Sequence, residues 1–499
     1  MKKRIIALLL SFLMLSFCAF SCTKSDGASS DNDRGQDVDI PMPEKDQDIP
    51  PVSENEDISE NEKDGLPKTA AFDNIPSVDY GGREFVILAT EPQFADSVDG
   101  KGIVGAELYK RNRAIEEKFN IKIVCKSADQ NSVKPSLQGA SEENPLPDLI
   151  YAPQDTIASC AGSGLLMNIY SVPYFDYQSE HCDPELLSSL SQSDTTYGVY
   201  GDAAYDERSV WCVFYNKDIL SYLGFADPYD LVENNSWTWD MFLAISEGAL
   251  LDLDKNGRMQ ASKDRYGYSS SMNTSSFANA VFASFGKKFF SVDEEGFLKM
   301  DFDISKEDDY ISVIRNICVS HKAKYPASDP GALALDAFNE GRLAFFCEKL
   351  SLASTLAYSP VNWGILPMPK RWANQAGYAS LVDSSVCGYA VPQGASDSSL
   401  SGRVLDAICA YEESYGTDIV DLSWTYYYLR DNDSVLAMRD AIDGTVYDVA
   451  YAFGEGMADF SMVSYDLLQS VMEKNVKFSN LYNQSVKPFS AFIRQKFVH

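Results

Sequence analysis

The sequence predicts an α/β fold that begins with a parallel, doubly wound sheet, because strand patterns alternate with helical patterns. Residues 84–90, EFVILAT, have the composition of a buried strand. Residues 104–120 then show a helical apolar spacing, and residues 121–125, IKIVC, alternate as a strand does. A third strand is predicted at 148–152, DLIYA, before another helix. Repeats of this kind form right-handed crossovers between parallel strands.

The helix predicted at 104–120 has one apolar face, made of Val104, Leu108, Ile115 and Phe119. Lysine, arginine and glutamate occupy the opposite face. A helix with this pattern buries its apolar face against a sheet and exposes the charged face to water. The pattern therefore places the helix on the surface of the predicted sheet.

A polar pair, Gln154 and Asp155, follows the third predicted strand, and the helix after it ends near Gly162 to Gly164. In open parallel sheets, ligands bind just beyond the carboxyl ends of the strands. The pair is therefore a candidate ligand contact. The alternative is that Asp155 only caps the amino terminus of the helix.

The composition limits the classes of function. The 499 residues suffice for two or three domains, and a hydrophobic content of 45% suffices for a sizeable core. The net charge of -31 argues against nucleic acid as a partner, because binding a phosphate backbone needs clustered lysine and arginine. Only three histidines occur, His181, His321 and His499, which argues against metal-centred chemistry and most nucleophile–histidine mechanisms.

Residues 1–21 predict a secretory signal peptide, because a basic start precedes an apolar run over residues 5–20. That run is short for a membrane-spanning helix. The sequence AFSC at 19–22 resembles the bacterial lipobox, in which the cysteine is acylated. The resemblance implies a lipid anchor at Cys22; the alternative is a plain signal peptide with an incidental cysteine.

Residues 22–75 are predicted to form the lipidated cysteine and an acidic disordered tether. Residues 23–68 contain 14 Asp and Glu residues and 5 Lys and Arg residues, which gives a net charge of -9. A segment with so few large apolar residues cannot offset the entropy lost on ordering. We expect an extended spacer that holds the folded body away from a membrane.

Eight further cysteines occur, and none forms a CxxC motif: Cys125, Cys160, Cys182, Cys212, Cys318, Cys347, Cys387 and Cys409. Most lie in apolar runs, which is typical of buried thiols that pack as small hydrophobic side chains. A location outside the cell permits disulfides, and the sequence leaves their pairing open.

Six sequence blocks occur in the order found in one protein family. They are PDLIYAPQDTIASCAGSGLLMNI, VFYNKDIL (213–220), WTWDMFLAIS (237–246), FNEGRLAFFCEK (338–349), VNWGILPMPK (361–370) and SSVCGYAVPQGA (384–395). The set resembles bacterial maltodextrin-binding proteins and the wider family 1 of extracellular solute-binding proteins of ABC importers. The lipobox, the tether and the block VGAELYKRNRAIEEKFNIKI are most similar to lipoprotein members from Gram-positive bacteria.

That resemblance implies a two-lobed periplasmic-binding-protein-like fold of type II, in which a hinge joins two mixed sheets flanked by helices. Carried onto this chain, lobe one comprises residues 80–208 and 326–383, and lobe two comprises residues 209–325 and 384–499. The fourth and fifth blocks are expected to return the chain to lobe one, and the sixth to cross again. The ligand is expected in the cleft between the lobes.

The resemblance also implies which side chains bind the ligand. A sugar presents apolar faces, which suit aromatic rings, and a rim of hydroxyl groups, which suits carboxylates and amides. The candidates are Gln154, Asp155, Trp211, Glu348, Trp372, Trp424 and Tyr451. Where the family has an aromatic residue this chain has Ala152, which implies a different ligand or a different ligand orientation.

Most of these candidates have a structural alternative. Glu348 and Lys349 follow a strand and are equally consistent with a surface ion pair. Trp372 lies in a polar loop, where it stacks on a ligand or packs at the rim. Trp211 lies beside the hinge and Trp424 lies in an aromatic cluster. Each is consistent with a position in the cleft or in the core.

Other aromatic residues are predicted to be structural. Trp237 and Trp239 begin a helix, and Trp363 lies in a strand-like stretch. Tyr451 precedes the glycine pair of GEG at 454–456, where the backbone can approach a ligand closely. A role for Tyr451 in packing alone is the alternative.

Residues 252–264, DLDKNGRMQASKD, resemble the start of an EF-hand calcium loop, with Asp252, Asp254 and Asn256 at ligand positions. The twelfth position should carry a bidentate glutamate, but it carries Lys263, which removes charge that the cation needs. A tight polar turn is the preferred interpretation, and calcium is the alternative. No other cofactor is expected.

The leading hypothesis is a monomeric, lipid-anchored protein on the outer face of the cytoplasmic membrane, which captures a sugar or oligosaccharide and delivers it to an ABC permease without chemistry. A secreted glycan-active enzyme is an alternative, but no local signature isolates the two carboxylates that it would need. A surface adhesin or sensor with the same fold is the other alternative.

Overall fold

The computed structural model describes residues 68–97, 100, 102–192, 194–225, 227–270, 274–288, 290–326, 333–416, 428–448, 451, 465–474 and 476–497. The predicted signal peptide, Cys22, most of the predicted tether and Trp424 lie outside the described residues. Within the described ranges, no helix has the length and apolar character needed to cross a membrane.

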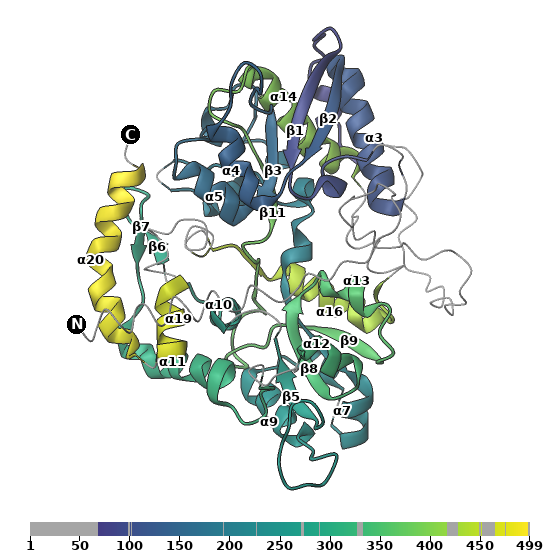
Figure 1. Cartoon of the computed structure of the whole chain (residues 1–499), viewed down its shortest axis with the longest axis vertical. Helices are drawn as coiled ribbons and strands as arrows, with labels where there is room; N and C mark the ends of the chain where they lie inside the picture. Colours follow the sequence, from purple (N-terminus) through teal and green to yellow (C-terminus); the bar gives the residue numbers. More distant parts are fainter. Residues whose placement is uncertain are drawn as a thin grey trace, which may run out of the picture. The chain divides into compact units, whose positions relative to one another are not determined.

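The first sheet has four strands in the order β11-β3-β1-β2 (Figure 1). The strands are β1 (Arg83–Ala89), β2 (Ile121–Ser127), β3 (Leu149–Pro153) and β11 (Cys387–Ala390). β1 pairs in parallel with β2 and with β3, whereas β11 is antiparallel to β3. The alternation of strands and helices predicted for this part of the chain is confirmed, and one strand from far along the chain completes the sheet.

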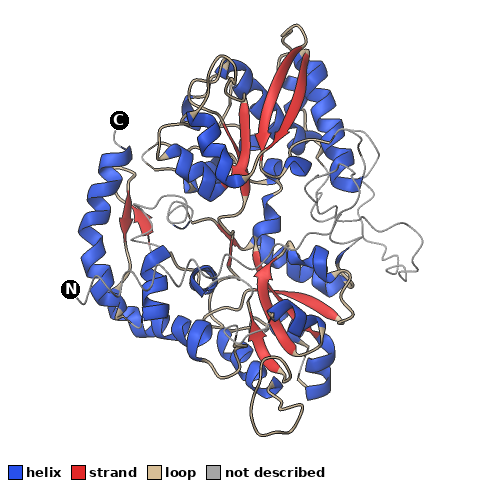
Figure 2. Cartoon of the chain, viewed as in Figure 1, coloured by secondary structure: helices blue, strands red, loops and turns tan. Residues whose placement is uncertain are grey.

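Helices flank this sheet (Figure 2). They are α3 (Gly102–Phe119), α4 (Gln130–Gln138), α5 (Gln154–Ala161) and α14 (Ser398–Tyr415). The predicted apolar face of α3 is fully buried at Leu108, Ile115 and Phe119. α3 and α14 contact each other, so a helix from the carboxyl-terminal half of the chain belongs to the amino-terminal sheet.

The second sheet is mixed and has the order β5-β8-β4-β9. Its strands are β4 (Trp211–Asn216), β5 (Tyr266–Ser269), β8 (Leu343–Lys349) and β9 (Trp363–Pro367). β4 is antiparallel to both β8 and β9, and β5 is parallel to β8. Every residue of the central strand β4 and of the edge strand β9 is buried, so both faces of this part of the sheet are covered.

Three tryptophans lie in the core around the second sheet, as predicted. Trp237, Trp239 and Trp363 have no exposed surface. Each indole N–H donates a hydrogen bond: Trp237 to the Pro367 carbonyl at 2.9 Å, Trp239 to Ser284 Oγ at 2.9 Å, and Trp363 to the Leu356 carbonyl at 2.7 Å. Burial of these rings is compatible with their polar N–H groups because each group has a partner.

Strand pairing corrects the predicted division into lobes for two segments. Residues 326–383, predicted in lobe one, contribute β8 and β9 to the second sheet. The segment from residue 384, predicted in lobe two, contributes β11 and α14 to the first sheet and its core. β11 packs tightly against Tyr200 at Gly388. A Cβ added at Gly388 would lie 2.4 Å from a ring carbon of Tyr200, so a larger residue would clash there. Local periodicity carries no information on such long-range pairing.

The remaining strands form two further sheets of two strands each, β6 with β7 and β10 with β12. The remaining helices are α2 (Ala71–Asn74), α6 (Pro184–Ser189), α7 (Lys217–Leu223), α8 (Pro228–Glu233), α9 (Trp239–Ala249), α10 (Thr274–Ser284), α11 (Glu307–Arg315), α12 (Ala334–Asn339), α13 (Leu352–Leu356), α16 (Asn432–Asp443), α19 (Tyr465–Lys474) and α20 (Phe478–Phe497). The strands are β6 (Phe290–Val292), β7 (Leu298–Met300), β10 (Ser380–Leu381) and β12 (Thr445–Val446).

Candidate functional site

A buried carboxylate, Asp383, lies in the segment that joins β10 to β11, with 3% of its side chain exposed. Its Oδ2 accepts hydrogen bonds from Trp211 Nε1 at 3.4 Å and from the Tyr451 hydroxyl at 3.3 Å. Its Oδ1 accepts hydrogen bonds from the backbone N–H and the hydroxyl of Ser385, at 3.1 and 2.6 Å. The carboxylate therefore joins two predicted ligand-binding aromatic residues.

Lys349, at the end of β8, lies directly opposite Trp211 of β4 in the second sheet. Its Nζ lies 3.7 Å from Asp383 Oδ1 and donates a hydrogen bond to Ser385 Oγ at 3.0 Å. We call Asp383, Ser385, Lys349, Trp211 and Tyr451 the Asp383 cluster. Two strands of the second sheet and the segment that leads to β11 meet in this cluster.

The predicted polar pair at the end of β3 lies against the same segment. The backbone N–H of Gln154 donates to the Val386 carbonyl at 2.8 Å, and that of Asp155 donates to the Ser384 carbonyl at 3.3 Å. Ser384 follows Asp383 directly, so the backbone of the polar pair adjoins the Asp383 cluster. The end of the first sheet thus meets the end of the second sheet here.

The alternative role of Asp155 as a helix cap is wrong. The N-cap residue of α5 is Pro153, no side chain caps the helix, and Asp155 lies inside its first turn. The Asp155 carboxylate instead accepts hydrogen bonds from Gln130 Nε2 at 2.9 and 3.0 Å and from Thr156 Oγ1 at 3.0 Å. Gln130 begins α4, so two helices of the first sheet fix the position of this carboxylate.

Asp383 also interacts electrostatically with the other carboxylates. Burial raises the pKa of the Asp155 carboxyl, and the charge of Asp383 raises it further. Burial likewise raises the pKa of Glu348 to about 6, with Asp383 as an additional cause and Lys349 as an opposing one. Three carboxyl groups therefore lie close enough to influence one another, beside two aromatic rings.

Glu348 is buried, with 5% of its surface exposed, and Lys349 pairs with Asp383, so the alternative of a surface ion pair between Glu348 and Lys349 is wrong. The Lys349 backbone N–H donates to Glu348 Oε1 at 2.9 Å. The positive charge of Lys349 and the partial charge of this N–H only partly offset the cost of burying the Glu348 carboxylate.

We predict that Glu348→Gln stabilises the protein at pH 7 to 8 by up to about 2 kcal/mol. The folded chain holds the Glu348 proton more tightly than the unfolded chain, whose ordinary pKa is 4.5. Wild-type stability should therefore fall, relative to the variant, as the pH rises from 4.5 through about 6. Urea unfolding at several pH values measures the difference.

The matched control for this prediction is Glu294→Gln at an exposed position, which should change the unfolding free energy little at any pH. A Glu348→Gln variant with the same pH profile as the wild type would show that Glu348 ionises normally.

The structure does not bring every candidate into this region. Trp372 packs edge-on against Tyr310 of α11, with ring centroids 5.5 Å apart, and is 38% exposed. The guanidinium of Arg371 lies 5.0 Å from the Trp372 ring. Trp372 thus combines packing at the rim with an exposed surface, and its described contacts lie outside the Asp383 cluster.

Sequence reasoning missed Asp383, Ser385 and Gln130. A weak signal existed for Asp383, because the polar stretch Asp383 to Ser385 separates two apolar runs where the sixth sequence block begins. Gln130 offered no signal, since a glutamine at the start of a helix is usually exposed.

The calcium-like loop forms a tight polar turn. Asp252 accepts hydrogen bonds from the backbone N–H groups of Asn256 and Gly257, and Asp254 accepts one from Asn256. Lys263 Nζ lies 3.6 Å from Asp254. Asp252, Asp254 and the buried Asp264 offer oxygens within 4.8 Å of one another, so calcium binding stays an untested prediction.

The eight described cysteines are free thiols, and all but Cys125 are buried. This agrees with their prediction as small packed side chains.

A comparison with family models decides the family. The model described as bacterial extracellular solute-binding protein matches residues 110–403, more than half of the chain. This chain belongs to the bacterial extracellular solute-binding protein family. The predicted resemblance is confirmed, and the alternative of a glycan-active enzyme is wrong, because this is a family of binding proteins. No curated protein matches the sequence of this family member.

Solved structures support the same fold. The maltose/maltodextrin-binding domain MalE from Bdellovibrio bacteriovorus, bound to maltotriose, is 16% identical, covers 82% of this chain and 100% of its own, and gives a TM-score of 0.52. The galacto-N-biose-/lacto-N-biose I-binding protein of the ABC transporter from Bifidobacterium longum, in complex with lacto-N-biose, is 14% identical, with coverages of 84% and 99% and a TM-score of 0.56.

The maltose-maltodextrin binding protein of Alicyclobacillus acidocaldarius is also similar, at 14% identity, with coverages of 82% and 100% and a TM-score of 0.51. Identities this low establish the fold alone. The solute-binding protein therefore has the predicted two-lobed periplasmic-binding-protein-like fold, with helices flanking each sheet.

Proposed function

We propose that this solute-binding protein captures a sugar or short oligosaccharide beside the Asp383 cluster and delivers it, unaltered, to an ABC permease. The observation that carries the proposal is the meeting of four predicted contacts at one place. Trp211 and Tyr451 donate hydrogen bonds to Asp383, the Asp155 backbone donates to Ser384, and Glu348 precedes Lys349, which pairs with Asp383. They come from both sheets, where the resemblance implies the ligand site.

The chemistry of these side chains suits a polyhydroxylated ligand. Buried carboxylates accept hydrogen bonds from hydroxyl groups, and each such bond nets about 0.5 to 1.5 kcal/mol, or about 1.5 to 3 kcal/mol when the acceptor is charged. Trp211 is fully buried and stacks on Phe277 of α10 with centroids 6.0 Å apart, so its ring supports the site from within the core. Fixed acceptors select a ligand with little ordering cost.

Similar proteins favour a carbohydrate over other solutes. Two of the structures described above were solved with maltotriose and with lacto-N-biose. A further one, the GacH receptor of Streptomyces glaucescens, was solved in complex with acarbose. We therefore propose an oligosaccharide as the ligand class of this chain.

Anchoring and delivery complete the proposal. Acylation at Cys22 would hold the protein on the outer face of the cytoplasmic membrane, and the acidic tether would let the folded body reach a permease. Two acyl chains are needed for a stable anchor, since each buried CH₂ group contributes about 0.8 kcal/mol. Radiolabelled palmitate incorporation that disappears in Cys22→Ala tests this part separately.

The test of ligand capture is a thermal-shift panel of oligosaccharides on the purified protein, followed by calorimetry and recovery of the bound compound. We expect at least one oligosaccharide to raise the melting temperature and to be recovered chemically unchanged. Stabilisation by peptides or polyols with no response to any oligosaccharide would replace the proposed ligand class.

We predict that Asp155→Asn weakens sugar binding by roughly 10- to 100-fold, because it removes a charged hydrogen-bond acceptor worth about 1.5 to 3 kcal/mol. Trp372→Ala should change the affinity by less than about 3-fold, because the described contacts of Trp372 lie outside the Asp383 cluster. Calorimetry measures both. Asp240→Asn is the matched control, since the Asp240 side chain is 78% exposed. Unchanged affinity in Asp155→Asn would remove Asp155 from the site.

A further inference from the structure

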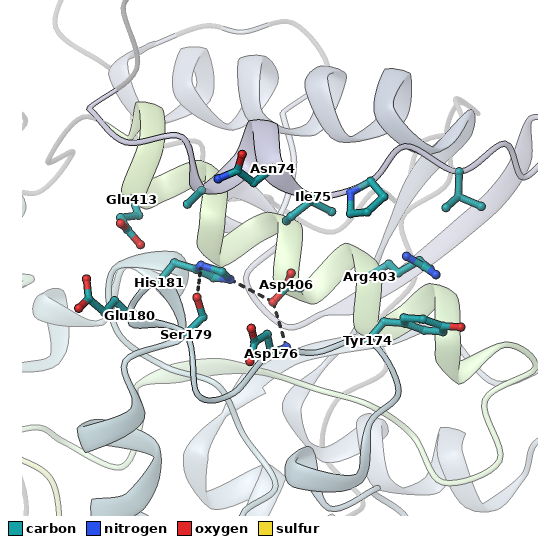
Figure 3. Close-up of a pocket in the computed structure, with 13 residues that line it drawn as sticks. Asn74, Ile75, Tyr174, Asp176, Ser179, Glu180, His181, Arg403, Asp406 and Glu413 are labelled. Atoms are coloured by element: carbon teal, nitrogen blue, oxygen red, sulfur yellow. Dashed lines mark hydrogen bonds and ion pairs between the residues drawn. The ribbon is translucent and has the colours of Figure 1, made fainter.

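A second group of reactive side chains lies away from the Asp383 cluster, at a pocket of about 650 Å³ beside α14 (Figure 3). His181 and Asp406 line this pocket, and Cys182 follows His181 in a 3₁₀ turn, Glu180–Cys182. One ligand atom from each of His181, Cys182 and Asp406 lies within 4.8 Å of the other two. Imidazole, thiol and carboxylate are the three donor types that bind Zn²⁺ in proteins.

The spacing of the three ligand atoms suits tetrahedral coordination. His181 Nε2 lies 3.1 Å from Asp406 Oδ1, and Cys182 Sγ lies 3.7 Å from the same oxygen. Metal–ligand lengths of about 2.0 to 2.3 Å at a tetrahedral angle separate nitrogen from oxygen by about 3.4 Å, and sulfur from oxygen by about 3.6 Å. These two separations differ from the tetrahedral values by only a few tenths of an ångström.

Two segments of the chain supply the three donors. Asp406 lies on α14, and His181 and Cys182 lie in the 3₁₀ turn Glu180–Cys182. The Cys182 thiol is buried, with 3% exposure. Three protein donors leave the fourth tetrahedral position for a water molecule.

Neighbouring groups orient two of the donors. Ser179 Oγ lies 2.8 Å from His181 Nδ1, and the backbone N–H of Asp176 donates to Asp406 Oδ1 at 3.1 Å. A hydroxyl accepts as well as donates, so Ser179 can accept a hydrogen bond from Nδ1–H while Nε2 binds a metal. Metal-binding histidines almost always have such a partner on the other ring nitrogen.

The pocket provides a route from solvent to two of these donors, His181 and Asp406, which both line it (Figure 3). Their side chains are only 9% and 10% exposed, so they do not lie on the open surface. A buried set of three donors that is reached from a pocket leaves room for a water molecule as the fourth ligand of a zinc ion.

We propose that His181, Cys182 and Asp406 bind a Zn²⁺ ion in the part of the fold built on the first sheet. The ion would join two segments more than 220 positions apart in the chain, since Cys182 and Asp406 are separated by 224 residues. Binding to the folded chain alone would stabilise it by mass action. No sequence motif predicts this site, because few histidines occur and the donors lie far apart in the chain.

The experiment is equilibrium dialysis of the purified, untagged full-length chain against Zn²⁺ alone, with metal measured by mass spectrometry. We expect one Zn²⁺ per chain and a higher melting temperature with Zn²⁺. Cys182→Ser and Asp406→Asn should each bind Zn²⁺ roughly 100-fold more weakly. Ser179→Ala, which keeps all three donors, should bind about 10- to 100-fold more weakly.

Cys318→Ser is the matched control, because Cys318 is a buried free thiol outside the cluster; this variant should keep its zinc. The wild-type chain offers a test that needs no variant: Co²⁺ in place of Zn²⁺ should give thiolate-to-metal charge-transfer absorption. Absence of this absorption, equal zinc in all variants, or a Cys182–Cys409 disulfide in the protein as isolated would each overturn the proposal.

Discussion

Replacing Asp383 with alanine should destabilise the protein by about 3 kcal/mol, because the buried cluster would lose the acceptor that its donors share. The Trp211 indole N–H, the Tyr451 hydroxyl and the Lys349 ammonium all face this carboxylate. Trp211 is fully buried, so water cannot replace the lost partner. Urea unfolding followed by circular dichroism measures the change.

The same variant should bind its sugar at least about 10-fold more weakly, because the rings of Trp211 and Tyr451 would no longer be held in place. Asp383 acts here as a positioning residue. Asp383→Asn keeps one acceptor oxygen and should recover part of the stability. Asp309→Ala is the control: Asp309 pairs with Lys306 at 3.7 Å, both side chains are more than half exposed, and removal should cost less than about 1 kcal/mol. An equal loss of unfolding free energy in Asp383→Ala and Asp309→Ala would show that Asp383 does not hold the cluster together.

Arg111→Met should destabilise the protein by about 3 to 5 kcal/mol, the usual cost of leaving a buried charge without its partner. Arg111 is fully buried on α3, and its Nη1 lies 3.2 Å from Glu412 of α14. Its Nη2 donates to the Tyr389 hydroxyl on β11 at 3.3 Å. The guanidinium therefore ties a helix of the first sheet to the strand that follows the Asp383 segment.

The effect of Arg111→Met should depend on pH and on Glu412. Burial already raises the pKa of Glu412, and loss of the cation should raise it further. The deficit of the variant should therefore shrink as the pH falls and Glu412 becomes protonated. The double variant Arg111→Met/Glu412→Leu should recover much of the stability, because it leaves no unpaired charge.

Arg494→Met is the control for the Arg111 experiment. Arg494 is half exposed and pairs with Asp293 at 3.0 Å, so its loss should cost less than about 1 kcal/mol. A wild-type-like stability for Arg111→Met, or a double variant weaker than the single one, would contradict this account of the ion pair.

Local sequence patterns predicted those parts of the fold that depend on residues close together in the chain. The predicted strand at 84–90 and helix at 104–120 fall within one or two residues of β1 and α3, because their apolar periodicity is set by neighbouring residues. Residues 384–390 look equally apolar, yet their place beside β3 depends on partners more than 230 positions earlier in the chain. No periodicity reports such a partner.

The candidate site was predicted in part for a similar reason. Gln154 and Asp155 were predicted as ligand contacts because they follow a strand, which is a local feature with a known consequence. Asp383 was missed because its significance depends on Trp211, which is 172 positions away, and on Tyr451, which is 68 positions away. The resemblance to a family supplied the aromatic candidates, and the structure showed which of them share one carboxylate.

Amide hydrogen exchange, with and without the sugar identified by the panel, tests the central claim most directly. The account predicts that added sugar slows exchange in three separate stretches, residues 153–156, 348–351 and 383–386, which adjoin the Asp383 cluster. Strong protection confined to other parts of the chain, or no protection at saturating sugar, would contradict the claim that this cluster holds the ligand.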